Sequence, residues 1–279
     1  MLNYLKTKTK GVELFYRLDN AKKPRANVVI NHGFAEHIGR YDYLAKSLVD
    51  AGYNVLRYDL RGHGQSKGPK GYIESYNNFI TDADSMVDLM KATNHDLSTF
   101  MLGHSMGGLV TTLYGINYPK KLDGQILSGA ANGKIPGASS IMAKGLAVAA
   151  KFFPFKNLKN PVGKELCSVP EVVEAYFKDP LVLKSATFNF YNEFFNKATD
   201  DVIKNLDKYS LPVLVLHGKE DAIVPVTISE NFYEKISSKN KELVIYPGLF
   251  HEIFNEKTKD EVIKKVISWL DDMVDTSNQ

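Results

Sequence analysis

The feature that most limits how this chain can fold is a repeated alternation between short apolar runs and helix-length amphipathic segments. Gly, Pro or polar turn residues bound each run, as they usually bound buried strands. The runs cover residues 27–31, 54–59, 99–103, 124–128, 213–217 and 243–246. The segments between them cover 41–51, 76–93, 106–118, 226–237 and 258–273. This order is typical of βαβ units, so we expect an α/β fold with a mostly parallel central sheet flanked by helices.

The alternation stops between residues 132 and 201. This segment carries phenylalanines among Lys and Pro, namely Phe152, Phe153, Phe155, Phe177, Phe188, Phe190, Phe194 and Phe195. A structureless loop of this length is unusual inside a compact domain, so we expect helices here that lie over one end of the sheet. We also expect a hairpin around Gly11. The chain then divides into an α/β core, residues 1–131 and 202–279, and a helical cap, residues 132–201, inserted after the sixth strand.

Composition excludes several classes of protein. The 279 residues, 44% of them hydrophobic, suffice for one substantial core. Lys and Arg number 35 against 32 Asp and Glu, and a net charge of +3 is too small for the field that nucleic-acid binding requires. No stretch reaches the roughly 18 apolar residues of a membrane span, and the first residues do not resemble a signal peptide. We therefore expect a soluble cytoplasmic protein, in which the single cysteine, Cys167, is a packing residue.

A candidate nucleophile follows one of the apolar runs. Residues 103–107 read Gly-His-Ser-Met-Gly between a strand-like run and a helix-like segment, which is the setting of a nucleophile elbow. A serine on such a strained turn needs neighbours without side chains, so that the turn packs closely and the hydroxyl stays exposed. Residues 64–68 match the same pattern, but they lie beyond their strand and run into Pro69, where no helix starts cleanly. We predict Ser105 as the nucleophile and Ser66 as an ordinary turn residue.

A serine nucleophile needs a general base, usually a histidine that a carboxylate orients. The expected chain order around such an elbow is Ser, acid, His. Only His217 and His251 lie beyond both Ser105 and the insertion, and His217 precedes the acidic residues of the following loop. His251 is therefore the predicted base. Both Glu220 and Asp221 qualify as the acid, since both follow a strand at the edge where catalytic groups gather.

Several motifs together resemble the monoglyceride lipase and lysophospholipase group of α/β-hydrolases, which are similar to serine aminopeptidase S33. The motifs are His32 to His37, Asp59 to Ser66, Gly103 to Gly108, Gly218 to Asp221 with Val224-Pro225, and Tyr246 to Glu252. They occur in the right order over nearly the whole chain. The resemblance implies the α/β-hydrolase fold, with Asp221 as the acid and His251 as the base.

The resemblance also implies an oxyanion hole formed by the backbone N–H groups of Phe34 and Met106. Losing one such donor typically costs about 3 kcal/mol in the transition state. Related lipases often carry a small residue where this chain has Phe34, so its ring is expected to narrow or line the acyl pocket. Together with His104, and with Leu146 and Val148 of the insertion, Phe34 is a predicted substrate-binding residue.

Other polar residues of these motifs are predicted to be structural. We expect Glu36, His37, Arg61 and His63 to pair with one another and brace the oxyanion loop. Metal binding is not expected, because no close His or Cys pairs have ligand spacing. Residues 62–64 supply only the start of a dinucleotide fingerprint, so no cofactor is expected.

The predicted function is hydrolysis of monoacylglycerols or related single-chain esters through an acyl-enzyme. Alternatives with the same triad are a lysophospholipase, a short-chain carboxylesterase or an acyltransferase. A receptor that only binds a small molecule in a hydrolase pocket is a further alternative, but it would not need all three groups of the triad.

Residues 139–153 predict a cap helix that is apolar over much of its circumference. Its apolar residues are Ile141, Met142, Leu146, Val148, Ala149, Phe152 and Phe153, and its charges are Lys144 and Lys151. Such a helix needs cover on more than one side. One interpretation is that it packs entirely within the protein. The other is that one face lines an acyl tunnel while another touches membranes or lipid assemblies peripherally.

Overall fold

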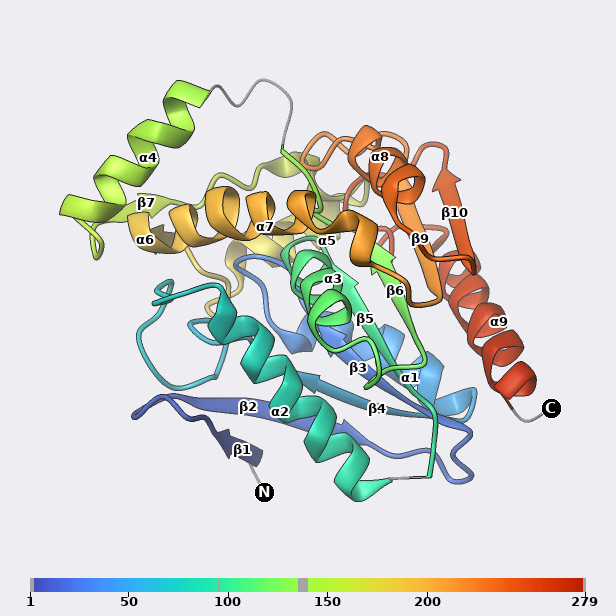
Figure 1. Ribbon diagram of the computed structural model, residues 1–279. Helices are drawn as coiled ribbons and strands as arrows, with labels where there is room; N and C mark the ends of the chain where they lie inside the picture. The colour runs from blue at the N-terminus through green and yellow to red at the C-terminus, as the bar shows by residue number, and fades with distance from the viewer. Residues whose placement is uncertain (1–2, 95, 135–139, 278–279) are drawn as a thin grey trace.

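The computed structural model describes residues 3–94, 96–134 and 140–277. The strands of the main sheet are β1 (Asn3–Lys6), β2 (Glu13–Asp19), β3 (Ala26–Asn31), β4 (Tyr53–Tyr58), β5 (Thr99–His104), β6 (Gly124–Ser128), β9 (Val213–Gly218) and β10 (Lys241–Tyr246). They lie in the order β1-β2-β4-β3-β5-β6-β9-β10 (Figure 1). Neighbours from β4 to β10 are parallel, and β1 and β2 form an antiparallel edge. The mostly parallel sheet predicted from the apolar runs is confirmed.

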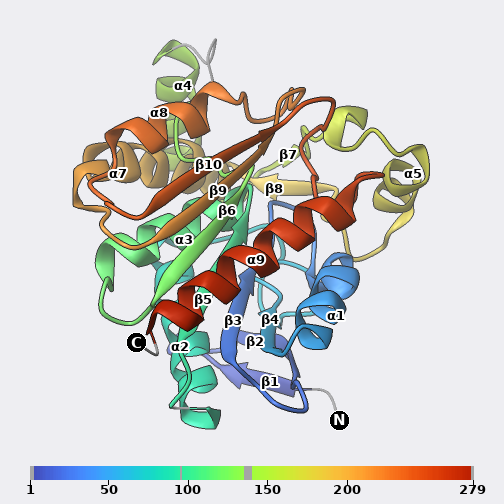
Figure 2. The same ribbon diagram turned by 90° about the vertical axis from the view of Figure 1, so that its right-hand side faces the viewer.

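Helices cover both faces of the sheet. Helices α1 (Asp42–Asp50) and α9 (Lys259–Ser277) lie on one face, and α2 (Asn77–Thr93), α3 (Met106–Asn117) and α8 (Thr227–Lys235) lie on the other (Figure 2). Each central strand serves both faces because successive side chains alternate. In β3, Val28 and Ile30 pack in the core of α1 and α9, whereas Val29 packs in the core of α2 and α3. A strand with both faces buried is mostly apolar along its length, which explains the nearly continuous apolar runs.

The segment between β6 and β9 contains elements of its own. They are α4 (Ser140–Phe152), β7 (Asn157–Lys159), η2 (Lys164–Leu166), α5 (Pro170–Lys178), β8 (Ser185–Thr187), α6 (Phe188–Tyr191), η3 (Asn192–Ala198), α7 (Thr199–Lys204) and η4 (Leu206–Lys208). Ser139, the predicted first residue of the cap helix, lies outside the described residues.

This segment lies over the edge of the sheet where the parallel strands end (Figure 1). Backbone hydrogen bonds join it to the loops after β3, β4 and β10: Leu183 N–H donates to Ala35 O, Thr187 N–H to Gly71 O, and Glu252 N–H to Leu166 O. Among the described residues, no helix has the length and apolarity needed to cross a bilayer.

Candidate active site

Ser105 lies at the sharp turn between β5 and α3. Its backbone angles are φ 52° and ψ −118°, and Ala35 is the only other non-glycine residue of the described chain with a positive φ. The turn packs too closely for side chains on either flank. A Cβ on Gly107 would lie 2.2 Å from Asn31 O, and a Cβ on Gly103 would lie 2.3 Å from Thr111 Oγ1. The glycine spacing read from the sequence thus has a direct steric cause.

Asp221 and His251 meet beyond the ends of β9 and β10. The Nδ1 atom of His251 is 2.6 Å from Asp221 Oδ2, and both side chains are buried. The other carboxylate oxygen, Oδ1, accepts hydrogen bonds from the backbone N–H groups of Ile223 and Val224 at 2.9 and 2.8 Å. Glu220, the competing acid, is exposed to solvent. The structure therefore brings Asp221, and not Glu220, to the histidine.

The pair is electrostatically polarised. Burial disfavours the charged forms of both groups, but the surrounding opposite charges together outweigh it. The pKa of His251 is raised, because the carboxylates of Asp221, Glu252 and Glu36 together stabilise the imidazolium more than burial destabilises it. The pKa of Asp221 lies well below its usual range, because the attraction of His251 and His217 outweighs its burial. The arrangement suits a histidine that gains a proton during a reaction and then gives it up.

A second histidine also holds Asp221, and the sequence analysis did not find this role. His217 is fully buried, and its Nε2 lies 3.1 Å from Asp221 Oδ2 and 2.8 Å from Val224 O. Its Nδ1 lies 2.7 Å from Ser229 Oγ. The signal was available, because His217 ends a strand four positions before the acid. It could not be read as a contact until the turn between the two residues was known.

Ser105, His104 and His251 line a cavity of about 510 Å³. Its apolar lining includes Pro161, Val162, Leu166, Tyr176, Phe194 and Phe195 from the segment between β6 and β9. Among the described residues the His251 ring bonds Asp221 and not the Ser105 hydroxyl, a contact that often tightens only when substrate binds.

The predicted substrate-binding residues divide into two groups. Phe34 and His104 line the cavity. Leu146 and Val148 are not among the described residues that line it: Leu146 packs against the main core, and the Val148 side chain is 56% exposed. The α4 helix therefore carries these two residues beside the core and at the surface, and does not bring them to Ser105.

The loop after β3 passes beside Ser105. A Cβ on Gly33 would lie 3.2 Å from Ser105 Cβ, and the next residue, Phe34, lines the cavity. The Phe34 ring packs against Phe190 and Tyr191 of α6, with ring centroids 5.4 and 5.6 Å apart. Met106 is the first residue of α3, where a backbone N–H has no intrahelical acceptor. Both predicted oxyanion donors thus belong to the backbone that adjoins the serine.

The prediction that Glu36, His37, Arg61 and His63 pair with one another is wrong. The side chains of Arg61, His37 and Glu36 bond residues outside this set, because their loops turn them toward different elements, while the His63 ring bonds a backbone group within it. Glu36 does brace the oxyanion loop, since its carboxylate bonds Gly33 N–H. Arg61 makes two 2.7 Å bonds to Asp82 of α2, and His37 lies 2.8 Å from Asp179, which follows α5. The His63 ring bonds the Arg61 carbonyl, and Glu36 bonds Arg40 and Tyr41.

Ser66 is fully buried outside this cavity. Its hydroxyl oxygen accepts a hydrogen bond from Phe15 N–H at 2.9 Å, and the hydroxyl donates to Asp59 O. The side chain thus joins β2 to the end of β4 and takes no part in the cavity.

A family model described as serine aminopeptidase, S33, matches residues 22–258. The chain belongs to this family. The monoacylglycerol lipase of Mycolicibacterium smegmatis is 33% identical over 247 residues, which cover 88% of this chain and 88% of the relative. Phospholipase YtpA of Bacillus subtilis is 31% identical over 263 residues, or 91% of this chain and 98% of the relative.

A solved structure gives the same assignment. The crystal structure of the Paleococcus ferrophilus monoacylglycerol lipase matches with a TM-score of 0.84 and 29% identity, covering 94% of this chain and 98% of that chain. The predicted α/β-hydrolase fold and the predicted resemblance are both confirmed.

Proposed function

We propose that this family member hydrolyses carboxylic esters of single-chain lipids, with monoacylglycerols as the leading substrates and Ser105, His251 and Asp221 as the catalytic triad. The observation that carries the proposal is one largely apolar cavity that contains both Ser105 and the histidine of a buried His–Asp pair. Its volume of about 510 Å³ suits a small lipid.

The chemistry proceeds in two steps. Ser105 Oγ attacks the ester carbonyl carbon while His251 takes the hydroxyl proton. The negative oxygen of the tetrahedral intermediate is stabilised by the N–H groups of Phe34 and Met106. The carbon–oxygen bond of the ester then breaks, His251 returns the proton to the leaving alcohol, and an acyl-enzyme remains. A water molecule, deprotonated by His251, releases the fatty acid by the same route.

A lysophospholipase is the second candidate, favoured by the 31% identity to a phospholipase. A panel of monoacylglycerols, lysophospholipids and p-nitrophenyl esters of graded chain length separates the candidates. We expect the highest kcat/KM for monoacylglycerols. A higher value for lysophospholipids of the same acyl chain would favour the second candidate. Failure of a fluorophosphonate probe to label Ser105 would overturn the serine mechanism itself.

We also propose that α4 contacts lipid assemblies. Its exposed apolar side chains are Ile141, Met142, Val148 and Phe152, and Phe153 and Phe155 follow it. Lys144 and Lys151 lie on the same helix. Exposed apolar area next to lysines favours adsorption to an anionic lipid surface. The face of α4 that carries these exposed side chains is the one proposed to contact lipid. The opposite face packs against the protein through Leu146 and the buried Ala150.

Two substitutions on α4 test the contact. Val148→Asp should weaken sedimentation with anionic phospholipid vesicles and leave Tm and hydrolysis of a short soluble ester unchanged. Leu146→Asp is the matched control, since a charge on the packed face should lower Tm and all activities together. Unchanged vesicle binding by the Val148→Asp protein would overturn the proposal.

A further inference from the structure

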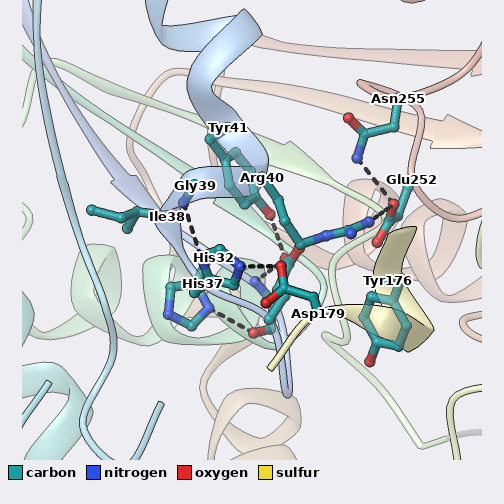
Figure 3. Close-up of polar contacts among 12 residues, drawn as sticks. His32, His37, Ile38, Gly39, Arg40, Tyr41, Tyr176, Asp179, Glu252 and Asn255 are labelled. Atoms are coloured by element: carbon teal, nitrogen blue, oxygen red, sulfur yellow. Dashed lines mark hydrogen bonds and ion pairs between the residues drawn. The ribbon is translucent and has the colours of Figure 1, made fainter. Parts of the chain in front are cut away.

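A buried polar network connects the loop after β3 to the loop that carries His251 (Figure 3). It starts at Glu36. One carboxylate oxygen, Oε1, accepts hydrogen bonds from Gly33 N–H at 2.5 Å and from the Tyr41 hydroxyl at 2.6 Å. The other, Oε2, accepts a bond from Arg40 Nε at 3.2 Å.

Arg40 carries the network across to the second loop. Its Nη2 donates to Oε2 of Glu252, the residue that follows His251, and Asn255 Nδ2 donates to the same oxygen at 3.0 Å. The guanidinium also lies 4.9 Å from the centroid of the Tyr176 ring (Figure 3). The side chains of Arg40, Glu36 and Glu252 are only 8, 4 and 6% exposed, so water screens these ion pairs poorly.

The loop after β3 needs such support. Ala35 has a φ of 66°, a strained backbone conformation for a non-glycine residue that persists only when the surroundings impose it. The Glu36 carboxylate bonds Gly33 N–H and so closes residues 33–36 around Phe34. Tyr41 and Arg40 in turn hold the Glu36 carboxylate, and Arg40 supplies its cationic partner.

We propose that Arg40 is a positioning residue, which holds Glu36 and Glu252 together and so fixes the oxyanion donor at Phe34 relative to His251. The inference rests on the proposed function. Arg40 is not among the described residues that line the 510 Å³ cavity, whereas Glu36 and Glu252 are. Arg40 therefore acts through these two carboxylates. Its planar fork suits two partners, which a lysine ammonium cannot hold in the same geometry.

The test compares two esters that share an acyl chain and differ in the alcohol, p-nitrophenyl decanoate and 1-decanoylglycerol. Arg40→Lys keeps a positive charge beside the buried carboxylates, which favours folding. Because oxyanion stabilisation and proton transfer serve every ester, kcat should fall about 10- to 100-fold on both substrates, with little change in KM. Glu252→Gln, which keeps the side-chain size, should produce the same parallel loss.

Arg61→Lys is the matched control. Arg61 is similarly buried, and its guanidinium forms two hydrogen bonds with Asp82 of α2 and none with Glu36 or Glu252 among the described residues. It should lower Tm to a similar degree and leave kcat unchanged. A loss by Arg40→Lys on the glycerol ester alone would overturn the inference, since it would indicate contact with the leaving alcohol. Unchanged kcat on both esters would also overturn it. A wild-type protein that hydrolyses neither ester would overturn the proposed function instead.

Discussion

Ser105 and Ser66 stand at the centre of two segments with the same Gly-x-Ser-x-Gly spacing, residues 103–107 and 64–68. At Ser66 the hydroxyl bonds two backbone groups and the side chain is completely buried. At Ser105 the backbone is strained and the side chain lines a cavity beside a buried His–Asp pair. The same five-residue pattern therefore supports the fold in one place and exposes a hydroxyl in the other.

The difference lies in what surrounds each serine. Residues 103–107 join a strand directly to a helix, so the chain must reverse within the turn and the serine points out of it. Residues 64–68 lie between β4 and α2, and Lys67 N–H bonds back to Glu13 O of β2. We expect the two serines to contribute separately, one to the reaction and the other to stability. The following predictions test that separation.

The largest expected effect is on the reaction. Ser105→Ala should lower kcat about 10⁶-fold, because no other group can form the acyl-enzyme. Tm should stay close to the wild-type value, since no hydrogen bond joins the Ser105 side chain to another residue of the described chain. Steady-state hydrolysis of p-nitrophenyl butyrate and thermal unfolding provide the two measurements. Near-normal turnover by a folded Ser105→Ala protein would show that Ser105 is not the nucleophile.

The next effect comes from the acid. Asp221→Asn should lower kcat about 10⁴-fold, because the histidine loses the partner that fixes its tautomer and stabilises its charged form. Glu220→Gln, one residue away and exposed, should leave kcat nearly unchanged. If these two results were reversed, the acid in this turn would be Glu220.

Ser66→Ala should lower stability and spare the reaction. Phe15 N–H and Asp59 O would both remain buried without their partner, and each unsatisfied group costs about 1–3 kcal/mol. Chemical denaturation should therefore give a lower free energy of unfolding, while kcat per folded molecule stays at the wild-type value. A fall in kcat without a fall in stability would contradict the assignment of Ser66 to the fold.

A smaller effect of opposite sign is expected at the elbow. Ser105→Gly should raise the free energy of unfolding by about 1 kcal/mol, because glycine relieves the strain at a φ of 52° and loses only part of this gain to its greater chain entropy. Ser105→Ala keeps the strain and serves as the reference. A Ser105→Gly protein less stable than the Ser105→Ala protein would show that the elbow is not strained.

The smallest effect is a shift along the pH axis. His251 must be neutral to act as a base, and its pKa is raised above the ordinary value of 6.5. The acidic limb of kcat/KM should therefore lie above pH 6.5. In Asp221→Asn the largest raising charge is gone while burial still lowers the pKa of His251, so the limb of the residual activity should move to lower pH.

Glu252 provides the control for this limb. Burial raises the pKa of Glu252 to about 7, so this neighbour titrates in the same range. If His251 sets the limb, it should persist in Glu252→Gln but move to lower pH, because the Glu252 carboxylate also raises the pKa of His251. Its disappearance in that variant would assign the limb to Glu252.

The sequence determined the central sheet and the elbow because both are local. A strand buried on both faces is a nearly continuous apolar run, and a close-packed turn must carry glycine on its flanks. The order of Ser105, acid and His251 along the chain was equally readable. The strands and the elbow depend on residues that are neighbours in sequence, whereas the chain order of the three groups follows the order expected around such an elbow.

Tertiary structure alone decided which residues meet across the fold. Glu220 and Asp221 are adjacent and similar in chemistry, yet only Asp221 reaches both His251 and His217. The apolar circumference of α4 left open which side would be covered, and packing against the core through Leu146 leaves Val148 exposed. Arg40 and Glu252 are far apart in sequence. They meet because the carboxyl ends of β3 and β10 lie on the same side of the sheet. No local pattern records such a contact, since its free energy comes from groups that only folding brings together.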